Sequence, residues 1–203
     1  GHDLREMQTK RAKADAGAVA VAVALKGLFD RCALMMQRIQ SIPQPVIAQV
    51  HGVAVAAGCQ LVATCDLAIA ADDTRFGVNG VNIGLFCSTP MVALTRNVSR
   101  KAAFEMLTTG RLIDADEAVR LGLINKAVPA ADLETETRAL AKTIAAKLAS
   151  AVKIGKQAFY AQANMSTEDA YAFTGEVMVA NMKNDDTAEG ITAFLEKRSP
   201  NWD

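Results

Sequence analysis

Residues 46–61 read VIAQVHGVAVAAGCQL, an apolar run that passes into a turn of small residues. The first part, residues 46–50, is bounded by a proline and a glycine and is typical of a strand buried in a parallel sheet. The small residues at 56–58 then open an apolar stretch that predicts a helix over residues 57–65. A buried strand followed closely by a helix indicates an α/β fold.

The sequence on both sides of this stretch predicts further elements. Large apolar residues recur at three- and four-residue spacing after Asp15, a candidate N-cap, and predict an amphipathic helix from Asp15 to Ile42. A second buried strand is expected over residues 67–71 and a short one over residues 74–77. Two asparagines and two glycines within residues 79–84 predict a turn after these strands.

Helical patterns dominate the rest of the chain. Ser99 and Asp114 are candidate N-caps, and Gly110 is a candidate C-cap. We therefore predict an α/β core over residues 1–128 and a C-terminal helical region over residues 129–203. The expected helices cover residues 89–98, 100–109, 115–121, 131–148, 151–163, 167–183 and 187–198.

Composition and charge exclude several classes of partner. The 203 residues include 22 basic and 22 acidic side chains, and no run of Lys or Arg exceeds two residues. Without a basic patch, nucleic acid is not expected as a partner. The longest stretch of low charge, residues 43–65, is interrupted by Gln, His and Gly, so no membrane span is expected. The four cysteines lack Cys-x-x-Cys spacing and predict neither a metal site nor a disulfide framework.

The start of the chain has the pattern of a strand end followed by a turn. Position 1 is Gly rather than Met, and the first four residues read Gly-His-Asp-Leu. We expect a segment upstream of this turn, and any targeting peptide would lie in it. The expected location is the cytoplasm, with the mitochondrion as the alternative.

The small-residue turn at 56–58 has a chemical use where it precedes a helix. The free N–H groups of a helix's first turn point at a ligand, with the positive end of the helix dipole behind them. Such a turn holds a phosphate, a carboxylate or the oxyanion of a thioester enolate. Tight packing of a strand against a helix explains the same small residues, and the G-x-G-x-x-G pattern of dinucleotide-binding folds is absent. The local sequence leaves these alternatives open.

Several separated blocks, taken together, resemble the crotonase (enoyl-CoA hydratase/isomerase) superfamily. They follow the family's order and comprise residues 1–4, 42–52, 57–61, 65–70, 76–77, 84, 107–110, 118, 122–124 and 189–198. The sequences of residues 56–61 and 84–90 are most similar to those of one subgroup of that superfamily. The resemblance implies a crotonase-type α/β spiral of ββα units that lacks its N-terminal strands here. It also implies that residues 129–203 are a trimerisation region, so a homo-trimer or hexamer is expected.

The resemblance implies that the chain binds an acyl-CoA thioester. Crotonases hold the thioester carbonyl oxygen between two backbone N–H groups, and the matching positions are His2 and Ala57. Alanine at 57 replaces the family's usual glycine, which matters little because the donor is the backbone amide. Asp3 and Leu4 belong to the same N-terminal turn as His2 and are assigned to CoA binding with it.

The resemblance implies that the C-terminal helix contributes to the CoA nucleotide pocket of a neighbouring subunit, and two of its residues match those contacts. Phe194 can stack on adenine and Lys197 can meet a phosphate. A core Phe and a solvated Lys explain the same sequence equally well. CoA would enter as part of the substrate, and neither a covalently bound cofactor nor a metal is expected.

The two glutamates that perform hydration in this superfamily are absent. One activates water and the other delivers a proton to the α-carbon, and their positions hold Gln60 and Gly80. Neither residue titrates, and losing a general acid or base typically forfeits ~10²–10⁴ in rate per group. Efficient hydration by the two-glutamate route is therefore not expected.

No neighbouring side chain is an obvious substitute. Cys87 has no His or Lys within 10 residues to lower its pKa, and we expect it to be core or pocket lining. Asp66 and His51 are expected to be structural.

Two functions therefore compete. The first is an acyl-CoA-binding protein that stabilises a thioester oxyanion through backbone amides and performs isomerisation, decarboxylation or thioester hydrolysis in place of hydration. The second is a catalytically silent paralogue that binds CoA esters or serves as an assembly or regulatory subunit. Gln60 and Gly80 favour the second function, whereas the small-residue turns favour ligand binding in either.

Overall fold

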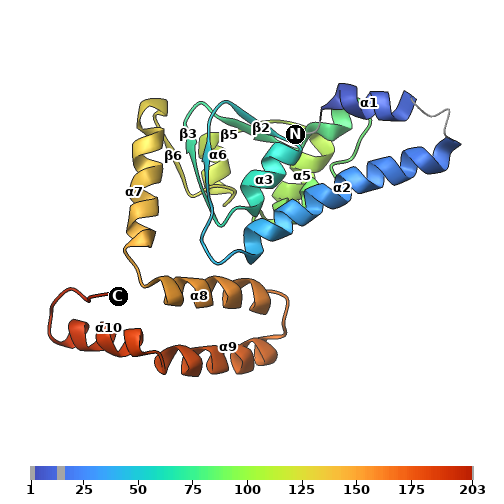
Figure 1. The fold of residues 1–203 in the computed structure, drawn as a ribbon. Coiled ribbons are helices and arrows are strands. Elements are labelled where there is room, and N and C mark those ends of the chain that lie inside the picture. The colour runs from blue at the N-terminus through green and yellow to red at the C-terminus, as the bar shows by residue number, and fades with distance from the viewer. Residues whose placement is uncertain (1–2, 13–16, 203) are drawn as a thin grey trace. The chain divides into compact units, whose positions relative to one another are not determined.

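The computed structural model describes residues 3–12 and 17–202. The chain forms two compact units (Figure 1). The first contains residues up to Gln40 together with Val46–Arg138, and the second contains Ser41–Pro45 and the residues from Ala139 onward. The sequence predicted a boundary after residue 128, between an α/β core and a helical region that mediates trimerisation. Both that boundary and the role of the helical region in assembly stay predictions.

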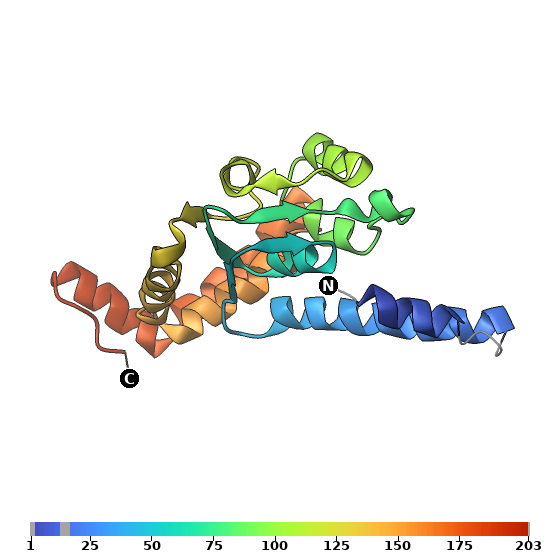
Figure 2. The ribbon, with the colours of Figure 1, turned by 90° about the horizontal axis from the view of Figure 1, so that it is seen from above.

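Two three-stranded sheets build the first unit. Parallel pairing gives the order β1-β3-β6 in one sheet, and the other has the order β2-β4-β5 with an antiparallel last pair (Figure 2). The parallel, buried character predicted for residues 46–50 and 67–71 is confirmed, because Ile47 pairs with Leu67 and Val50 with Ala70. The strands are β1 Ile47–Val50, β2 Val53–Val55, β3 Leu67–Ala71, β4 Arg75–Gly77, β5 Ile113–Asp114 and β6 Lys126–Val128.

Helices surround these strands and continue into the second unit. Those before the division are α1 Leu4–Ala12, α2 Gly17–Ser41, α3 Ala57–Thr64, α4 Pro90–Leu94, α5 Arg100–Thr109 and α6 Ala115–Arg120, with short 3-10 helices η2 Asn79–Ile83 and η3 Ala130–Asp132. The division falls within α7 Leu133–Ala145. The second unit continues with α8 Ala149–Gln162, α9 Thr167–Met182 and α10 Asp185–Leu195.

Local signals explain several helix ends. Asp114 Oδ1 accepts the Glu117 N–H at 2.8 Å, which confirms the predicted N-cap of α6. Gly110 ends α5 in the left-handed conformation, as predicted for a C-cap. Ser99 occupies the N-cap position of α5, but its side chain makes no capping hydrogen bond.

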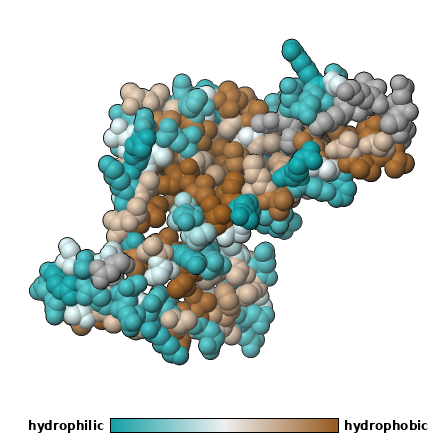
Figure 3. All heavy atoms as spheres, viewed as in Figure 1, coloured by the Kyte–Doolittle hydropathy of each residue, from teal (hydrophilic) through white to brown (hydrophobic). Residues whose placement is uncertain are grey.

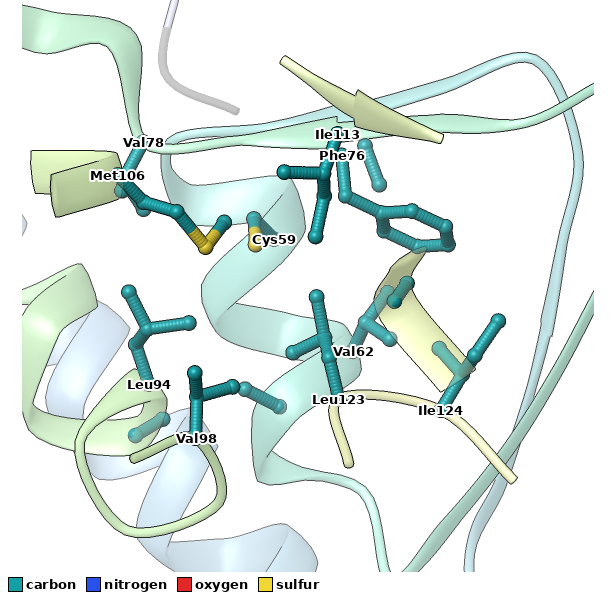
Figure 4. Close-up of a cluster of buried hydrophobic side chains, with 14 of the residues drawn as sticks. Cys59, Val62, Phe76, Val78, Leu94, Val98, Met106, Ile113, Leu123 and Ile124 are labelled. Carbon is teal, nitrogen blue, oxygen red and sulfur yellow. The ribbon is translucent and has the colours of Figure 1, made fainter. Parts of the chain in front are cut away.

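The core of the first unit lies between α3 and the helices that follow β4 in the chain. Its largest fully buried side chains include Phe76, Leu94, Met106 and Ile113 (Figure 4). Cys59 of α3 is also fully buried, and Figure 4 shows it near Met106 and Val78. One side of α3 is therefore fixed by apolar packing.

The second unit is a set of helices with much apolar surface. Within it, Lys156 Nζ donates to the Gln44 carbonyl at 2.8 Å and ties α8 to the segment before β1. Phe159, Tyr171 and Met178 are 64%, 77% and 59% exposed, and Figure 3 shows apolar residues at the surface of this unit.

The structure corrects the expectation for the chain's start. Leu4 begins α1, so a strand end at residues 1–4 is wrong for the described part, and Gly1 and His2 lie outside the described residues. Asp3 Oδ1 accepts the Arg5 N–H at 2.8 Å and the Glu6 N–H at 3.4 Å, which favours a helix start. Asp15, the candidate N-cap of α2, also lies outside the described residues.

Two other elements differ from the prediction. The helix expected over residues 89–98 ends at Leu94, because Asn97 Nδ2 donates to the carbonyls of Ala63 and Ala93 and residues 95–98 form tight turns instead. Strand β2 was not predicted, because three residues after a positive-φ glycine carry too little pattern to indicate a strand.

Candidate functional site

The turn before α3 adopts a backbone conformation that is rare for alanine. Ala56 has φ 48° and ψ −117°, a region that glycine adopts far more readily. The Ala56 N–H donates to the Gly77 carbonyl at 2.9 Å, and the Ala56 carbonyl accepts the Gln60 N–H at 2.9 Å. These two bonds connect the turn to the end of β4 and to the first turn of α3, and they fix the direction of the next peptide N–H.

That next N–H belongs to Ala57, the first residue of α3. Among the residues that the structure describes, nothing accepts a hydrogen bond from the N–H groups of Ala57 or Gly58. Unpaired N–H groups are expected at a helix start, where the dipole favours an anion or a partly negative oxygen. This helix start can therefore donate to a ligand's oxygen.

Gln60 lies one turn further along α3 and is only 5% exposed. Its Oε1 is 4.0 Å from the Cys32 Sγ of α2, a weak contact in which the thiol donates. Thr64 Oγ1 donates to the Gln60 main-chain carbonyl at 2.7 Å. No acceptor for Gln60 Nε2 exists in the described part of the chain.

Gly80 is buried at the start of η2, and the space for a side chain there is occupied. A Cβ at this position would lie 2.6 Å from the Leu85 carbonyl oxygen and 2.9 Å from Cys87 Sγ. The loop that fills this space is held by the Leu85 N–H, which donates to the Gly80 carbonyl at 2.9 Å. The absent carboxylate is thus accompanied by a backbone arrangement that excludes any side chain.

The two cysteines beside the site are buried. Burial raises the pKa of Cys59 to about 12, although the Gly77 N–H donates to its sulfur and opposes the shift. A thiol with that pKa stays protonated at neutral pH and is a poor nucleophile. Cys87 is 7% exposed and belongs to the apolar cluster, which confirms its expected place in the core or pocket lining.

Asp66 and His51 take the places expected of structural residues. Asp66 Oδ2 accepts the Val46 N–H at 2.6 Å and thereby connects the end of α3 to the chain just before β1. His51 is exposed between β1 and β2.

Strand pairing brings the main candidate residues of the first unit together. β2 runs parallel to β4 with Val55 opposite Gly77, so α3 and η2 both begin just beyond the same edge of this sheet. Ala57, Gln60 and Gly80 therefore gather at that edge. Leu4 is 52% exposed on α1, whereas His2 lies outside the described residues and its role stays a prediction.

The other candidates lie in the second unit. Phe194 is 82% exposed near the end of α10, and Lys197 follows with φ 56°. Phe194 lines a hollow of about 340 Å³ together with Trp202 and Asn181. Asn181 Oδ1 is buried and has no hydrogen-bond partner among the described residues.

The sequence analysis missed Trp202 and Asn181, although Trp202 is the chain's single tryptophan. The tail that places Trp202 folds back on α10, because Arg198 pairs with Glu189 at 2.6 and 2.9 Å and the Asn201 N–H donates to Glu189. Gly190 admits the indole, since a Cβ there would lie 2.9 Å from Trp202.

The described residues hold neither a metal-binding cluster nor a helix able to cross a membrane. No group of three or more His, Cys, Asp or Glu side chains in that part of the chain could hold a metal ion. Of the described helices, none combines the length and apolar character needed to cross a membrane.

Comparison with known proteins identifies the fold around this site. The sequence profile named enoyl-CoA hydratase/isomerase matches residues 1–203. The chain belongs to the enoyl-CoA hydratase/isomerase family. Proteins named enoyl-CoA hydratase domain-containing protein 3, mitochondrial, from Xenopus laevis and Homo sapiens, are each 47% identical to it over 202 residues. The predicted resemblance to the crotonase superfamily and to this subgroup is confirmed.

The match extends along the whole chain, which covers 66% of the Xenopus protein and 64% of the human one. The chain therefore spans about two thirds of the length of these enoyl-CoA hydratase/isomerase relatives. The word "mitochondrial" in their names describes those proteins, and the cytoplasmic location expected for this chain stays a prediction.

Solved structures confirm the crotonase fold. The crystal structure of human enoyl-CoA hydratase domain-containing protein 3 superposes with a TM-score of 0.89 at 47% identity, covering 100% of this chain and 76% of that one. A Mycobacterium smegmatis enoyl-CoA hydratase superposes with a TM-score of 0.87 at 54% identity, covering 88% of this chain and 70% of the other. The mixed α/β fold with helical extension is thus a family property.

Proposed function

We propose that this enoyl-CoA hydratase/isomerase family protein binds acyl-CoA thioesters at the turn before α3, with the thioester carbonyl oxygen accepting from the Ala57 N–H. The observation that carries the proposal is the orphan N–H of Ala57, directed by the strained backbone of Ala56. A preorganised N–H at a helix start stabilises negative charge on such an oxygen as an enolate forms. The His2 N–H is proposed as the second donor.

The residues of the site argue against hydration by two carboxylates. Gln60 cannot accept a proton from water, and Gly80 has neither a side chain nor the space for one. A reaction at this site must therefore avoid a carboxylate base, or the protein binds the thioester without turning it over. The silent, CoA-ester-binding or assembly paralogue is the second candidate, and the filled space at Gly80 favours it.

We propose that the hollow of the second unit contacts the nucleotide part of a CoA molecule whose thioester is bound by a neighbouring subunit. Phe194 and Trp202 offer aromatic faces on which adenine can stack, and Lys197 offers a cation for a phosphate. The unpaired Asn181 Oδ1 would accept from the adenine amino group. CoA enters here as part of the substrate.

The exposed apolar residues of α8 and α9 support an assembly role for the second unit. Phe159, Tyr171 and Met178 would be buried against copies of the same chain in a homo-trimer or hexamer. Analytical ultracentrifugation tests this expectation. A sedimentation coefficient of a monomer at micromolar concentration would contradict it.

Calorimetric titration of the full chain with CoA, acetyl-CoA and butyryl-CoA tests the ligand proposal. We expect saturable binding of the esters and weaker binding of free CoA, because only the esters place a carbonyl oxygen at the Ala57 N–H. Absence of heat with every ligand would contradict both the enzymatic and the silent-binding form of the proposal. Equal affinity for CoA and its esters would mean that the Ala57 N–H does not bind the thioester carbonyl oxygen.

A further inference from the structure

The segment after α10 turns back alongside that helix (Figure 1). The turn is made at Lys197, whose φ of 56° lies in the left-handed region. The Lys197 N–H donates to the Phe194 carbonyl at 3.2 Å, and the Arg198 N–H donates to the Ala193 carbonyl at 3.0 Å. Glycine usually occupies the left-handed position of such a helix end, because it has no Cβ. A lysine there indicates that contacts further along the tail hold the turn in place.

Glu189 of α10 holds the tail at two points. The Arg198 guanidinium donates to both oxygens of the Glu189 carboxylate, at 2.6 and 2.9 Å. The Asn201 N–H donates to the same carboxylate at 2.9 Å. A paired bond between a guanidinium and a carboxylate is stronger and more directional than a bond between neutral groups. Glu189, Arg198 and Asn201 therefore form a latch that fixes residues 198–201 on α10.

The residues next to the latch bring an indole ring against bare backbone. Gly190 follows Glu189 and Trp202 follows Asn201, so the hydrogen-bonded pair and the packed pair are adjacent. A Cβ at Gly190 would lie 2.9 Å from Trp202 Cη2 and 3.4 Å from Trp202 Cζ3. The latch thereby determines where the ring of Trp202 lies.

Trp202 in this position is one wall of the hollow of about 340 Å³. Phe194 lines the same hollow, and none of the described residues that line it is charged. An uncharged hollow with two aromatic side chains suits an aromatic base better than a phosphate group. Stacking of a base depends on where the ring lies, so Trp202 can serve as a wall only while the tail stays docked.

We propose that Glu189 and Arg198 are positioning residues that hold Trp202 for stacking against the adenine of CoA, so that nucleotide binding and docking of the tail are coupled. This inference rests on the nucleotide contact proposed above. A ligand that binds only the docked form of the tail stabilises that form, and docking raises the affinity for the ligand by the same factor. A change that releases the tail therefore weakens CoA binding without altering the turn before α3.

Removal of the latch should leave the helices folded. The Glu189–Arg198 pair is partly exposed, and such ion pairs contribute little to global stability. Glu189→Ala also places a good helix former inside α10, so its far-UV circular dichroism should match that of the unaltered chain. Glu196→Ala is the matched control. Glu196 also accepts from Arg198, at 2.7 Å, whereas the Asn201 N–H donates to Glu189 instead.

Calorimetric titration of these full-length variants with acetyl-CoA tests the positioning role. The worth of a base stacked on an aromatic side chain predicts that Trp202→Ala weakens binding about tenfold. Glu189→Ala should cause a loss of similar size. The double variant should lose no more than Trp202→Ala alone, because Glu189 acts through Trp202. Glu196→Ala should bind acetyl-CoA as the unaltered chain does.

The possible outcomes separate this inference from the proposed function. Additive losses in the double variant, or unchanged affinity in Trp202→Ala or Glu189→Ala, would overturn the inference while leaving the proposed function standing. Failure of the unaltered chain to bind acetyl-CoA would remove the proposed function, and this inference with it.

Acrylamide quenching of the chain's single tryptophan is a second readout, which does not depend on measured affinities. We expect acetyl-CoA to reduce quenching in the unaltered chain, and we expect Glu189→Ala to increase quenching when no ligand is present. Equal quenching in the unaltered chain and in Glu189→Ala would mean that the latch does not position Trp202.

Discussion

At the scale of single residues, Ala56 adopts a backbone conformation that alanine disfavours. Its φ of 48° and ψ of −117° belong to glycine's range, yet the position carries a Cβ. The hydrogen bonds to Gly77 and from Gln60 hold it there. Strain of this kind persists where the surrounding structure over-determines the conformation, and it often lies at functional sites.

The strain at Ala56 predicts that Ala56→Gly stabilises the chain. Relief of about 1–3 kcal/mol of strain outweighs about 0.4–1 kcal/mol of added unfolded-state entropy, so a gain of about 1 kcal/mol is expected. Urea unfolding measures it. The matched Ala57→Gly variant, at the first position of α3, has no such strain to relieve and should instead lose up to about 1 kcal/mol. A loss for Ala56→Gly as large as that for Ala57→Gly would contradict the strained conformation.

At Gly80, by contrast, a substitution is expected to destabilise the chain. Adding a Cβ forces the Leu85 carbonyl or the Cys87 thiol to move, so Gly80→Ala should destabilise the chain by about 1–3 kcal/mol. For the same reason, Gly80→Glu should fail to restore hydration. Gly58→Ala is the matched control, because its Cβ meets nothing within 4 Å and should be tolerated. Thermal unfolding of both variants decides between these outcomes.

Phe194 offers a test of nucleotide binding. If adenine stacks on its ring, Phe194→Ala should weaken CoA binding by about 1–3 kcal/mol, the usual worth of a base on an aromatic side chain. Phe104→Ala is the control, since Phe104 is 64% exposed and lies outside the hollow. Titration with free CoA measures both variants. Equal affinities would assign Phe194 to some other role.

At the scale of elements, the sequence predicted what local patterns determine. Helices α5 and α6 were predicted almost to the residue because Gly110 and Asp114 mark their ends through backbone and capping bonds. Strand β2 and the end of α4 escaped prediction because pairing with β4 and the side chain of Asn97 decide them. Tertiary contacts override local propensity in both cases.

In the candidate site, too, some features could be predicted from the local sequence and others depend on tertiary contacts. The identities of Gln60 and Gly80 follow directly from the sequence once the family is suspected. The occupied space beside Gly80 and the strained Ala56 could not be predicted, because both depend on segments separated from them in the chain that fold back against them.

The end of α10 carries a pH dependence with a defined sign. The hydrogen bonds from Arg198 and then from the Asn201 N–H lower the pKa of Glu189 from 4.5 to about 2. Because the folded pKa is depressed, this stabilisation is fully present above pH 4.5 and is lost as the pH falls toward 2. The tail bearing Trp202 should therefore detach in acid.

The matched variant is Glu189→Gln, which cannot ionise. We expect the unaltered chain to lose quenching or shielding of its single tryptophan between pH 4.5 and 2, while Glu189→Gln shows little change over that interval. Tryptophan fluorescence with an added quencher records both. A titration of the same shape in the two proteins would mean that Glu189 does not control the tail.

At the scale of the whole molecule, the chain combines a family fold with an altered site. Membership of the enoyl-CoA hydratase/isomerase family is established by the profile match over residues 1–203 and by relatives at 47% identity. The helix start that can hold a thioester oxygen is present, whereas the two positions that perform hydration hold Gln60 and Gly80. The central claim is that the chain binds acyl-CoA thioesters but does not hydrate them by the two-carboxylate route.

A single-turnover experiment with the full chain in excess over crotonyl-CoA tests this claim most directly. The mixture is passed through a sizing column, and the thioester in each fraction is identified by mass spectrometry. We predict that crotonyl-CoA elutes with the protein and is recovered unhydrated. Conversion to the 3-hydroxy ester within the time of mixing, or elution of all crotonyl-CoA at the position of the free ligand, would contradict the account.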